Sequence, residues 1–129
     1  MLLDRNEKKG DFIILALNLG DEVEEHTVLA DAGLKFKQLD GMYNGEKERS
    51  YLVPFVSADE FSVILNLARS YDQESILVSD EYRECQLLFL NTNKVEYLGE
   101  LTAVSESEAR RESAYTFDPV SGTYWICKR

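Results

Sequence analysis

The segment from Tyr43 to Tyr51, YNGEKERSY, carries the polar side chains best suited to hold a small molecule. Successive side chains of a β-strand point to opposite faces, so Glu48 and Ser50 share one face while Arg49 and Tyr51 share the other. A carboxylate beside a hydroxyl on one face can supply the polar contacts that orient a ligand in a pocket. The alternative is a strand edge on which Glu48 and Ser50 simply face solvent.

Two further polar side chains can join this pair. Asn18 follows the first apolar run of the chain, and Gln73 stands between an expected helix and an expected strand. We therefore predict a ligand-binding group of Asn18, Glu48, Ser50 and Gln73, suited to a small molecule or a nucleotide. Gln73 also has a plainer interpretation, because the end of a helix leaves backbone groups that a nearby side chain can cap.

Known catalytic and metal-binding signatures are missing from the sequence. His26 is the only imidazole, and no Gly-x-Ser-x-Gly turn offers a nucleophile. Cys85 and Cys127 are the only cysteines, so one chain cannot build a four-ligand zinc site from Cys and His. We assign no catalytic residue, no metal and no cofactor, and we leave open whether the protein is an enzyme, with a binding protein favoured.

The charge is strongly negative and unevenly distributed. Asp and Glu number 24 against 14 Lys and Arg, which gives a net charge of −10 and argues against direct binding of nucleic acid. The acids concentrate in residues 21–31 and 58–84. One interpretation is an acidic surface, formed by Glu24, Glu25, Asp59 and Glu60, that binds a protein with a basic surface. The other is that these acids are solvated residues of helix first turns, which the helix dipole favours.

Hydrophobic periodicity predicts the elements that position these residues. An apolar strand over residues 12–17 precedes a helix over 22–32, two strands joined near Asn44-Gly45, and a helix over 58–70 that Ser57 and Glu60 cap. Three strands, a short helix after Ser105 and a final hairpin follow. We expect an α+β fold: one mixed or antiparallel sheet with two main helices and one short helix mostly on one face.

The chain is expected to form one globular domain over residues 1–129, with residues 1–10 frayed. Its longest apolar run is six residues, Phe12 to Leu17, whereas a membrane-spanning helix needs about 20. The first residues also lack the apolar core of a signal peptide. We therefore expect a cytoplasmic protein without a membrane partner; its oligomeric state does not follow from the sequence.

Four short motifs carry a resemblance to a known family: Asn18-Leu19-Gly20, Gly41-x-Tyr43-x-Gly45-x-x-Glu48-x-Ser50, Tyr71-Asp72-Gln73-Glu74-Ser75 and Ala114-Tyr115-Thr116. Over residues 11–127 the chain resembles a small uncharacterised domain family of bacteria and tailed phages. That family commonly has Pro after the first Asn, where this chain has Leu19. The resemblance implies no activity, cofactor or catalytic residue, but it implies an origin in a phage or mobile element.

Two functional hypotheses follow. The first is a small acidic interaction protein, phage-encoded, that binds and inhibits a host or defence protein. The second is a small-ligand or nucleotide-binding protein, with or without catalysis, whose pocket surrounds Glu48 and Gln73.

Overall fold

Eight strands and three helices follow one another within residues 10–129, the part of the chain that the computed structural model describes. Their order is the predicted one, while the lead-in expected over residues 1–10 lies, except for Gly10, outside the described residues. The elements are β1 (Phe12–Leu15), α1 (Glu22–Asp31), β2 (Lys37–Tyr43), β3 (Glu46–Pro54), α2 (Ala58–Ser70), β4 (Ser75–Ser79), β5 (Glu84–Phe89), β6 (Val95–Val104), α3 (Glu106–Ala109), β7 (Ala114–Asp118) and β8 (Thr123–Lys128).

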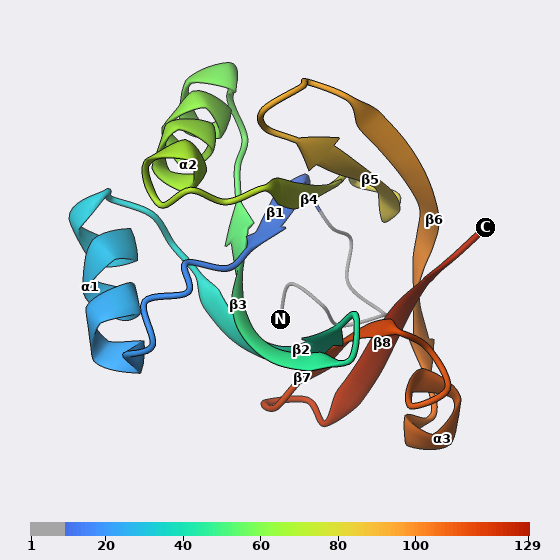
Figure 1. Cartoon of the computed structure of the whole chain (residues 1–129). Helices are drawn as coiled ribbons and strands as arrows, with labels where there is room; N and C mark the ends of the chain where they lie inside the picture. Colours follow the sequence, from blue (N-terminus) through green and yellow to red (C-terminus); the bar gives the residue numbers. More distant parts are fainter. Residues whose placement is uncertain (1–9) are drawn as a thin grey trace.

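The architecture differs from the expected one. All eight strands form a closed antiparallel barrel in the order β1-β3-β2-β7-β8-β6-β5-β4, so the predicted α+β sheet with helices on one face is wrong (Figure 1). Closure comes from two pairings between distant segments, β1 with β4 and β2 with β7. A closed barrel leaves no strand edge without a partner.

The barrel divides the apolar side chains into two cores. Phe12, Leu52, Leu101 and Trp125 belong to the core inside the barrel. Ile13, Leu29, Ile64 and other side chains fill the second core, which includes the outward-facing residues of β1 and β3 and the inner faces of α1 and α2. All four residues of β1 are buried, because one face of this strand lines the barrel and the other faces the helices.

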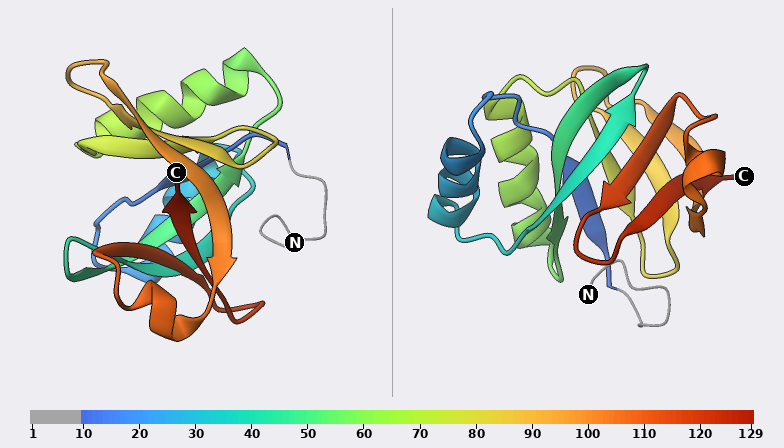
Figure 2. Two further views of the ribbon diagram at one scale, coloured as in Figure 1. Left: turned by 90° about the vertical axis from the view of Figure 1, so that its right-hand side faces the viewer. Right: turned by 90° about the horizontal axis from the view of Figure 1, so that it is seen from below.

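The helices lie outside the barrel. Figures 1 and 2 show α1 and α2 beside each other on one side of the barrel, with α3 on the opposite side, where it contacts β8. Side-chain oxygens of Asp21, Ser57 and Ser105 cap the starts of α1, α2 and α3, and the cap at Ser57 is the one predicted above. None of these three helices is both long and apolar enough to cross a membrane.

Candidate functional site

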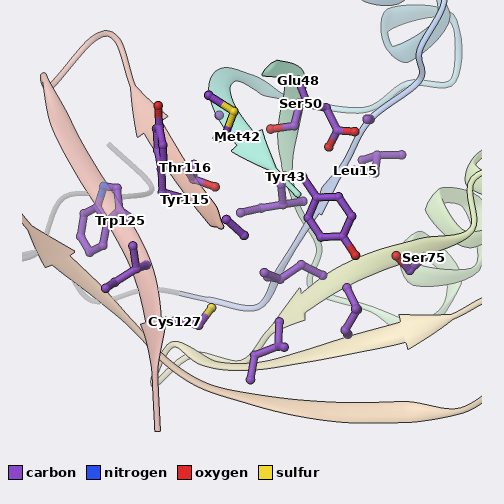
Figure 3. Close-up of a pocket in the computed structure, with 18 of the residues that line it drawn as sticks. Leu15, Met42, Tyr43, Glu48, Ser50, Ser75, Tyr115, Thr116, Trp125 and Cys127 are labelled. Carbon is purple, nitrogen blue, oxygen red and sulfur yellow. The ribbon is translucent and has the colours of Figure 1, made fainter. Parts of the chain in front are cut away.

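A cavity of about 600 Å³ opens into the barrel, within the size range of ligand pockets. Its inner wall is mainly apolar, and the buried part includes Ile14, Leu101 and Trp125. Exposed polar residues mark its mouth. Figure 3 shows Glu48, Ser50 and Ser75 on one side of the cavity and Trp125 and Cys127 on the other. The space therefore combines an apolar interior with a polar entrance.

All four predicted ligand-binding residues line this cavity. Glu48 and Ser50 come from β3, where Glu48 is half-buried and Ser50 is buried. Asn18 comes from the connection between β1 and α1, and Gln73 from the connection between α2 and β4. The amide nitrogen of Gln73 also donates to the Tyr71 carbonyl oxygen at 3.3 Å, so Gln73 helps to close the end of α2 as well as lining the cavity.

The wall beside Glu48 depends on a glycine. Gly41 faces Glu48 across the β2–β3 pairing and Thr116 across the β2–β7 pairing. A Cβ atom at Gly41 would lie only 2.6 Å from the carbonyl oxygen of Tyr115, closer than real Cβ atoms approach an oxygen. Glycine at this position therefore allows β7 to pack against β2 next to the cavity.

The environment of Glu48 favours its neutral form. Burial raises the pKa of the Glu48 carboxyl, and the nearby negative charge of Glu46 raises it further. A positive charge in the cavity would stabilise the ionised form of this carboxyl, so Glu48 is suited to pair with a cationic group of a ligand.

Further lining residues were not predicted as a site. Asp72, Glu74 and Glu112 are exposed and add three carboxylates to the mouth of the cavity. Trp125 is almost fully buried, and its Nε1–H has no hydrogen-bond partner among the described residues. Buried donors are normally paired, so this indole N–H stands out as a group that an acceptor could satisfy. Trp125 and Cys127 are two residues apart on β8, so strand alternation places their side chains on one face. Only the pairing of β8 with β7 and β6 shows that this face forms the cavity wall.

The two cysteines come together at this wall. Both are free thiols, and Cys127 lines the cavity while Cys85 is fully buried. The neighbouring Cys127 thiol and then burial raise the pKa of Cys85, whereas the neighbouring Cys85 thiol lowers the pKa of Cys127 even though burial acts to raise it. Proximity of these residues was left open by the sequence.

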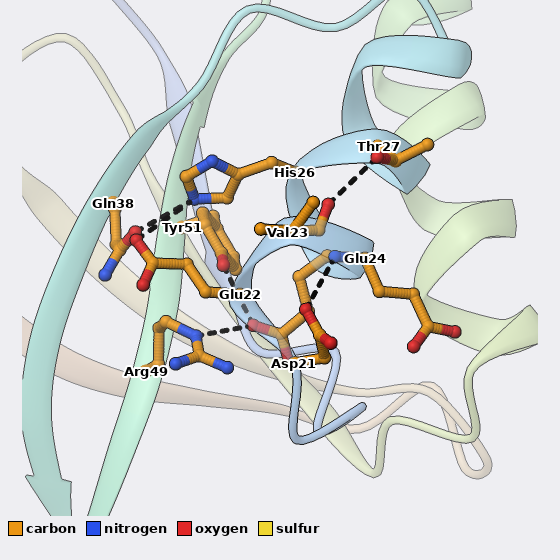
Figure 4. A network of polar contacts seen from close by, with 10 residues as sticks. Asp21, Glu22, Val23, Glu24, His26, Thr27, Gln38, Arg49 and Tyr51 are labelled. Carbon is orange, nitrogen blue, oxygen red and sulfur yellow. Dashed lines mark hydrogen bonds and ion pairs between the residues drawn. The ribbon is translucent and has the colours of Figure 1, made fainter.

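Glu25 is not an exposed partner-binding residue, so that prediction is wrong. The side chain is only 2% exposed. Its Oε1 accepts hydrogen bonds from Arg49 Nε at 2.7 Å and from the Tyr51 hydroxyl at 2.8 Å, the two dashed lines that start at Arg49 and Tyr51 in Figure 4. Its Oε2 accepts from the Leu19 backbone N–H at 3.0 Å. Burial raises the pKa of Glu25, but the hydrogen bonds from Arg49, Tyr51 and Leu19 outweigh this effect and lower it. Arg49 and Tyr51, on the outward-facing side of β3, hold the Glu25 carboxylate in this buried position. Helical periodicity alone does not reveal these two donors.

The other three acids of the predicted partner surface stay at or near the surface. Glu24 and Asp59 are exposed, whereas Glu60 is half-buried and its Oε1 accepts from the Val56 N–H at 3.0 Å. Glu60 thus completes the cap of α2. No group of three or more His, Cys, Asp or Glu within residues 10–129 is arranged to hold a metal ion.

The chain matches the sequence model of a known protein family. The sequence model of the S-Adenosylmethionine lyase family matches residues 16–128, which include every strand that lines the barrel except β1. No curated protein matched the chain.

Proposed function

Because the chain belongs to the S-adenosylmethionine lyase family, we propose that it cleaves S-adenosylmethionine and that the cavity inside the barrel is the active site. The observation that carries this proposal is one cavity with an apolar interior and four carboxylates, Glu48, Asp72, Glu74 and Glu112, at or near its mouth. S-adenosylmethionine has matching parts: a flat, weakly polar adenine and an amino-acid arm that bears a sulfonium and an ammonium.

The two ends of the substrate suggest how it would lie. The adenosyl part would enter the apolar interior, where a ring nitrogen of adenine is the kind of acceptor that the Trp125 N–H lacks. The amino-acid arm would remain near the polar entrance. There Glu48 would face the ammonium group, and the ion pair would offset the burial that raises the pKa of this carboxyl.

A lyase breaks the carbon–sulfur bond without adding water. We propose that the carboxylate of the substrate attacks the carbon that bears sulfur in its own amino-acid arm, which closes a five-membered lactone. The electron pair of the broken bond stays on sulfur, so the sulfonium becomes a neutral thioether and no proton needs to move. One negative and one positive charge disappear in this step, and an environment with little water favours that change over bulk solvent. The chain's residues would bind the substrate, hold its arm in the bent conformation and exclude water.

The direct test is incubation of the purified protein with S-adenosylmethionine, with products followed by chromatography and mass spectrometry. We expect one neutral thioether for each substrate consumed. Glu48→Gln should lower kcat/KM by about 10-fold or more, the effect of losing one charge-assisted contact, while Glu96→Gln, whose exposed side chain on β6 lies outside the cavity lining, serves as the matched control. Intact substrate after incubation with the wild-type protein would contradict the proposal.

The expectations about origin and partner remain separate proposals. They are an origin in a phage or mobile element, a cytoplasmic location, and inhibition of a host or defence protein through exposed acids such as Glu24 and Asp59. Cleavage of S-adenosylmethionine corresponds to the second hypothesis from the sequence, a ligand-binding protein with catalysis.

A further inference from the structure

We propose that Glu25, on the outside of the barrel, is a positioning residue that holds Asn18 at the mouth of the cavity. This inference rests on the proposed function, because Asn18 matters for kinetics only if the cavity is the active site. Glu25 itself does not line the cavity, so any effect on the reaction must pass through other residues.

Three segments of the chain converge on the Glu25 carboxylate. Glu25 lies on α1, Arg49 and Tyr51 lie on β3, and Leu19 lies in the connection between β1 and α1. The distances of 2.7, 2.8 and 3.0 Å place donors from β3 and from the connection on both carboxylate oxygens. In Figure 4, Arg49 and Tyr51 extend from β3 toward α1.

Each residue that donates to Glu25 is adjacent in sequence to a residue that lines the cavity. Leu19 follows Asn18, and Arg49 and Tyr51 alternate with Glu48 and Ser50. Backbone fixed at one residue restricts the direction of the next side chain. The carboxylate therefore links the outer face of the barrel wall to the placement of side chains on its inner face and at its mouth.

Asn18 is the residue that depends most on this link. It is exposed, and its backbone has a φ of +55°, in the left-handed region that few residues besides glycine, asparagine and aspartate adopt. By contrast, Glu48 and Ser50 are held by the backbone pairing of β3 with its neighbours. The Leu19 N–H bond to Glu25 fixes the peptide that follows Asn18 and so favours this left-handed conformation. Leu19 supplies that N–H, which a proline at this position would lack.

A purely stabilising role would not require a carboxylate here. Buried ion pairs are weak evidence for stability, since well-packed apolar residues often replace them without loss. A carboxylate offers only acceptors, whereas the isosteric amide of glutamine has one acceptor oxygen and turns its NH₂ donors toward groups that are donors themselves. Glu25→Gln thus loosens the link while it keeps the size of the side chain.

The experiment is a double-mutant cycle on S-adenosylmethionine cleavage with Glu25→Gln, Asn18→Gly and the double variant. Glycine at position 18 removes the side chain and still accommodates a φ of +55°. We expect Glu25→Gln to lower kcat/KM by about 10-fold or more in the wild-type background, mostly through KM. In the Asn18→Gly background the same change should lower kcat/KM by less than about twofold. Glu24→Gln, at the exposed residue that precedes Glu25 on α1, is the matched control and should retain wild-type kinetics.

Glu25→Asp provides a second variant if Glu25→Gln does not fold. It keeps the charge but withdraws the carboxylate by one methylene, so it should show the same dependence on Asn18. Hydrogen exchange of the Leu19 amide gives an independent readout. We expect this amide to exchange at least about 10-fold faster in Glu25→Gln than in the wild type or in Glu24→Gln.

Equal losses of kcat/KM in both backgrounds, or no loss in either, would overturn the positioning role. If the wild-type protein does not cleave S-adenosylmethionine, the proposed function fails, and the exchange of the Leu19 amide then decides the structural half of the inference alone. Unchanged exchange in Glu25→Gln would refute it.

Discussion

Glu25 connects protonation to stability at the scale of single residues. Its pKa lies below the ordinary value of about 4.3 for a glutamate because three donors favour the charged form despite burial. A lowered folded-state pKa contributes stability that is present above the unfolded-state pKa and is lost as pH falls through the folded-state pKa. Acid should therefore weaken the wild-type protein partly through this one residue.

Glu25→Gln should lower the free energy of unfolding by about 1–3 kcal/mol at pH 7, the cost of leaving buried donors unpaired. The gap between the two proteins should shrink as pH falls below about 4, since a protonated glutamate resembles glutamine. Urea unfolding at pH 7, 5, 4 and 3 measures both effects. Glu24→Gln should stay within about 0.5 kcal/mol of the wild type throughout. A gap for Glu25→Gln that is the same at every pH would show that its carboxylate is not the source of the difference.

The sequence predicted part of the site at this scale, and the limits are physical. Strand alternation correctly placed Glu48 and Ser50 on one face, because the period of a strand is independent of its partners. The sequence could not reveal Trp125 or Glu112 as neighbours of that pair, since β8 and the segment before β7 reach the cavity only after the barrel closes. Glu25 was misplaced because its burial depends on donors from β3.

At the scale of elements, α2 tests how local signals and packing share in stability. Ser57 accepts the Glu60 N–H at 3.1 Å, and Ile64 is fully buried in the core between barrel and helices. Ser57→Ala should cost about 0.5–2 kcal/mol and Ile64→Ala about 2–5 kcal/mol of unfolding free energy. Leu65→Ala should cost less than Ile64→Ala, because Leu65 is only half-buried. Urea unfolding of the three variants gives the ranking; a larger loss at Ser57 than at Ile64 would contradict this account of α2.

The same comparison explains why elements were predictable and the barrel was not. Caps, turns and apolar periodicity act within about ten residues, so they predict the order of strands and helices along the chain. The structure confirms that order along residues 12–128. The architecture depends on β1 pairing with β4 and on β2 pairing with β7, across separations of roughly 60–80 residues. Apolar residues on both faces of β1 are consistent with two architectures: an open sheet covered on both faces, and a barrel wall covered by helices. The pattern of β1 therefore does not distinguish them.

At the scale of the whole molecule, negative charge should assist capture of the proposed substrate. The chain carries a net charge of −10, and Asp72, Glu74 and Glu112 concentrate part of it at the mouth of the cavity. S-adenosylmethionine carries a net positive charge, because its sulfonium and ammonium outnumber its single carboxylate. Fields of this kind raise the local concentration of an oppositely charged ligand and are screened by salt.

We therefore expect kcat/KM for S-adenosylmethionine to fall severalfold between ionic strengths of about 0.01 M and 0.15 M, as the Debye length drops from about 30 Å to about 8 Å. The inhibition constant of S-adenosylhomocysteine, which lacks the sulfonium charge, should change much less. The triple variant Asp72→Asn, Glu74→Gln, Glu112→Gln should lose most of the salt dependence; asparagine tolerates the φ of +56° at position 72. Steady-state kinetics of both proteins across the salt series measure the effect. Equal salt dependence for the charged substrate and the neutral analogue, or for the two proteins, would show that the acids at the mouth do not attract the substrate.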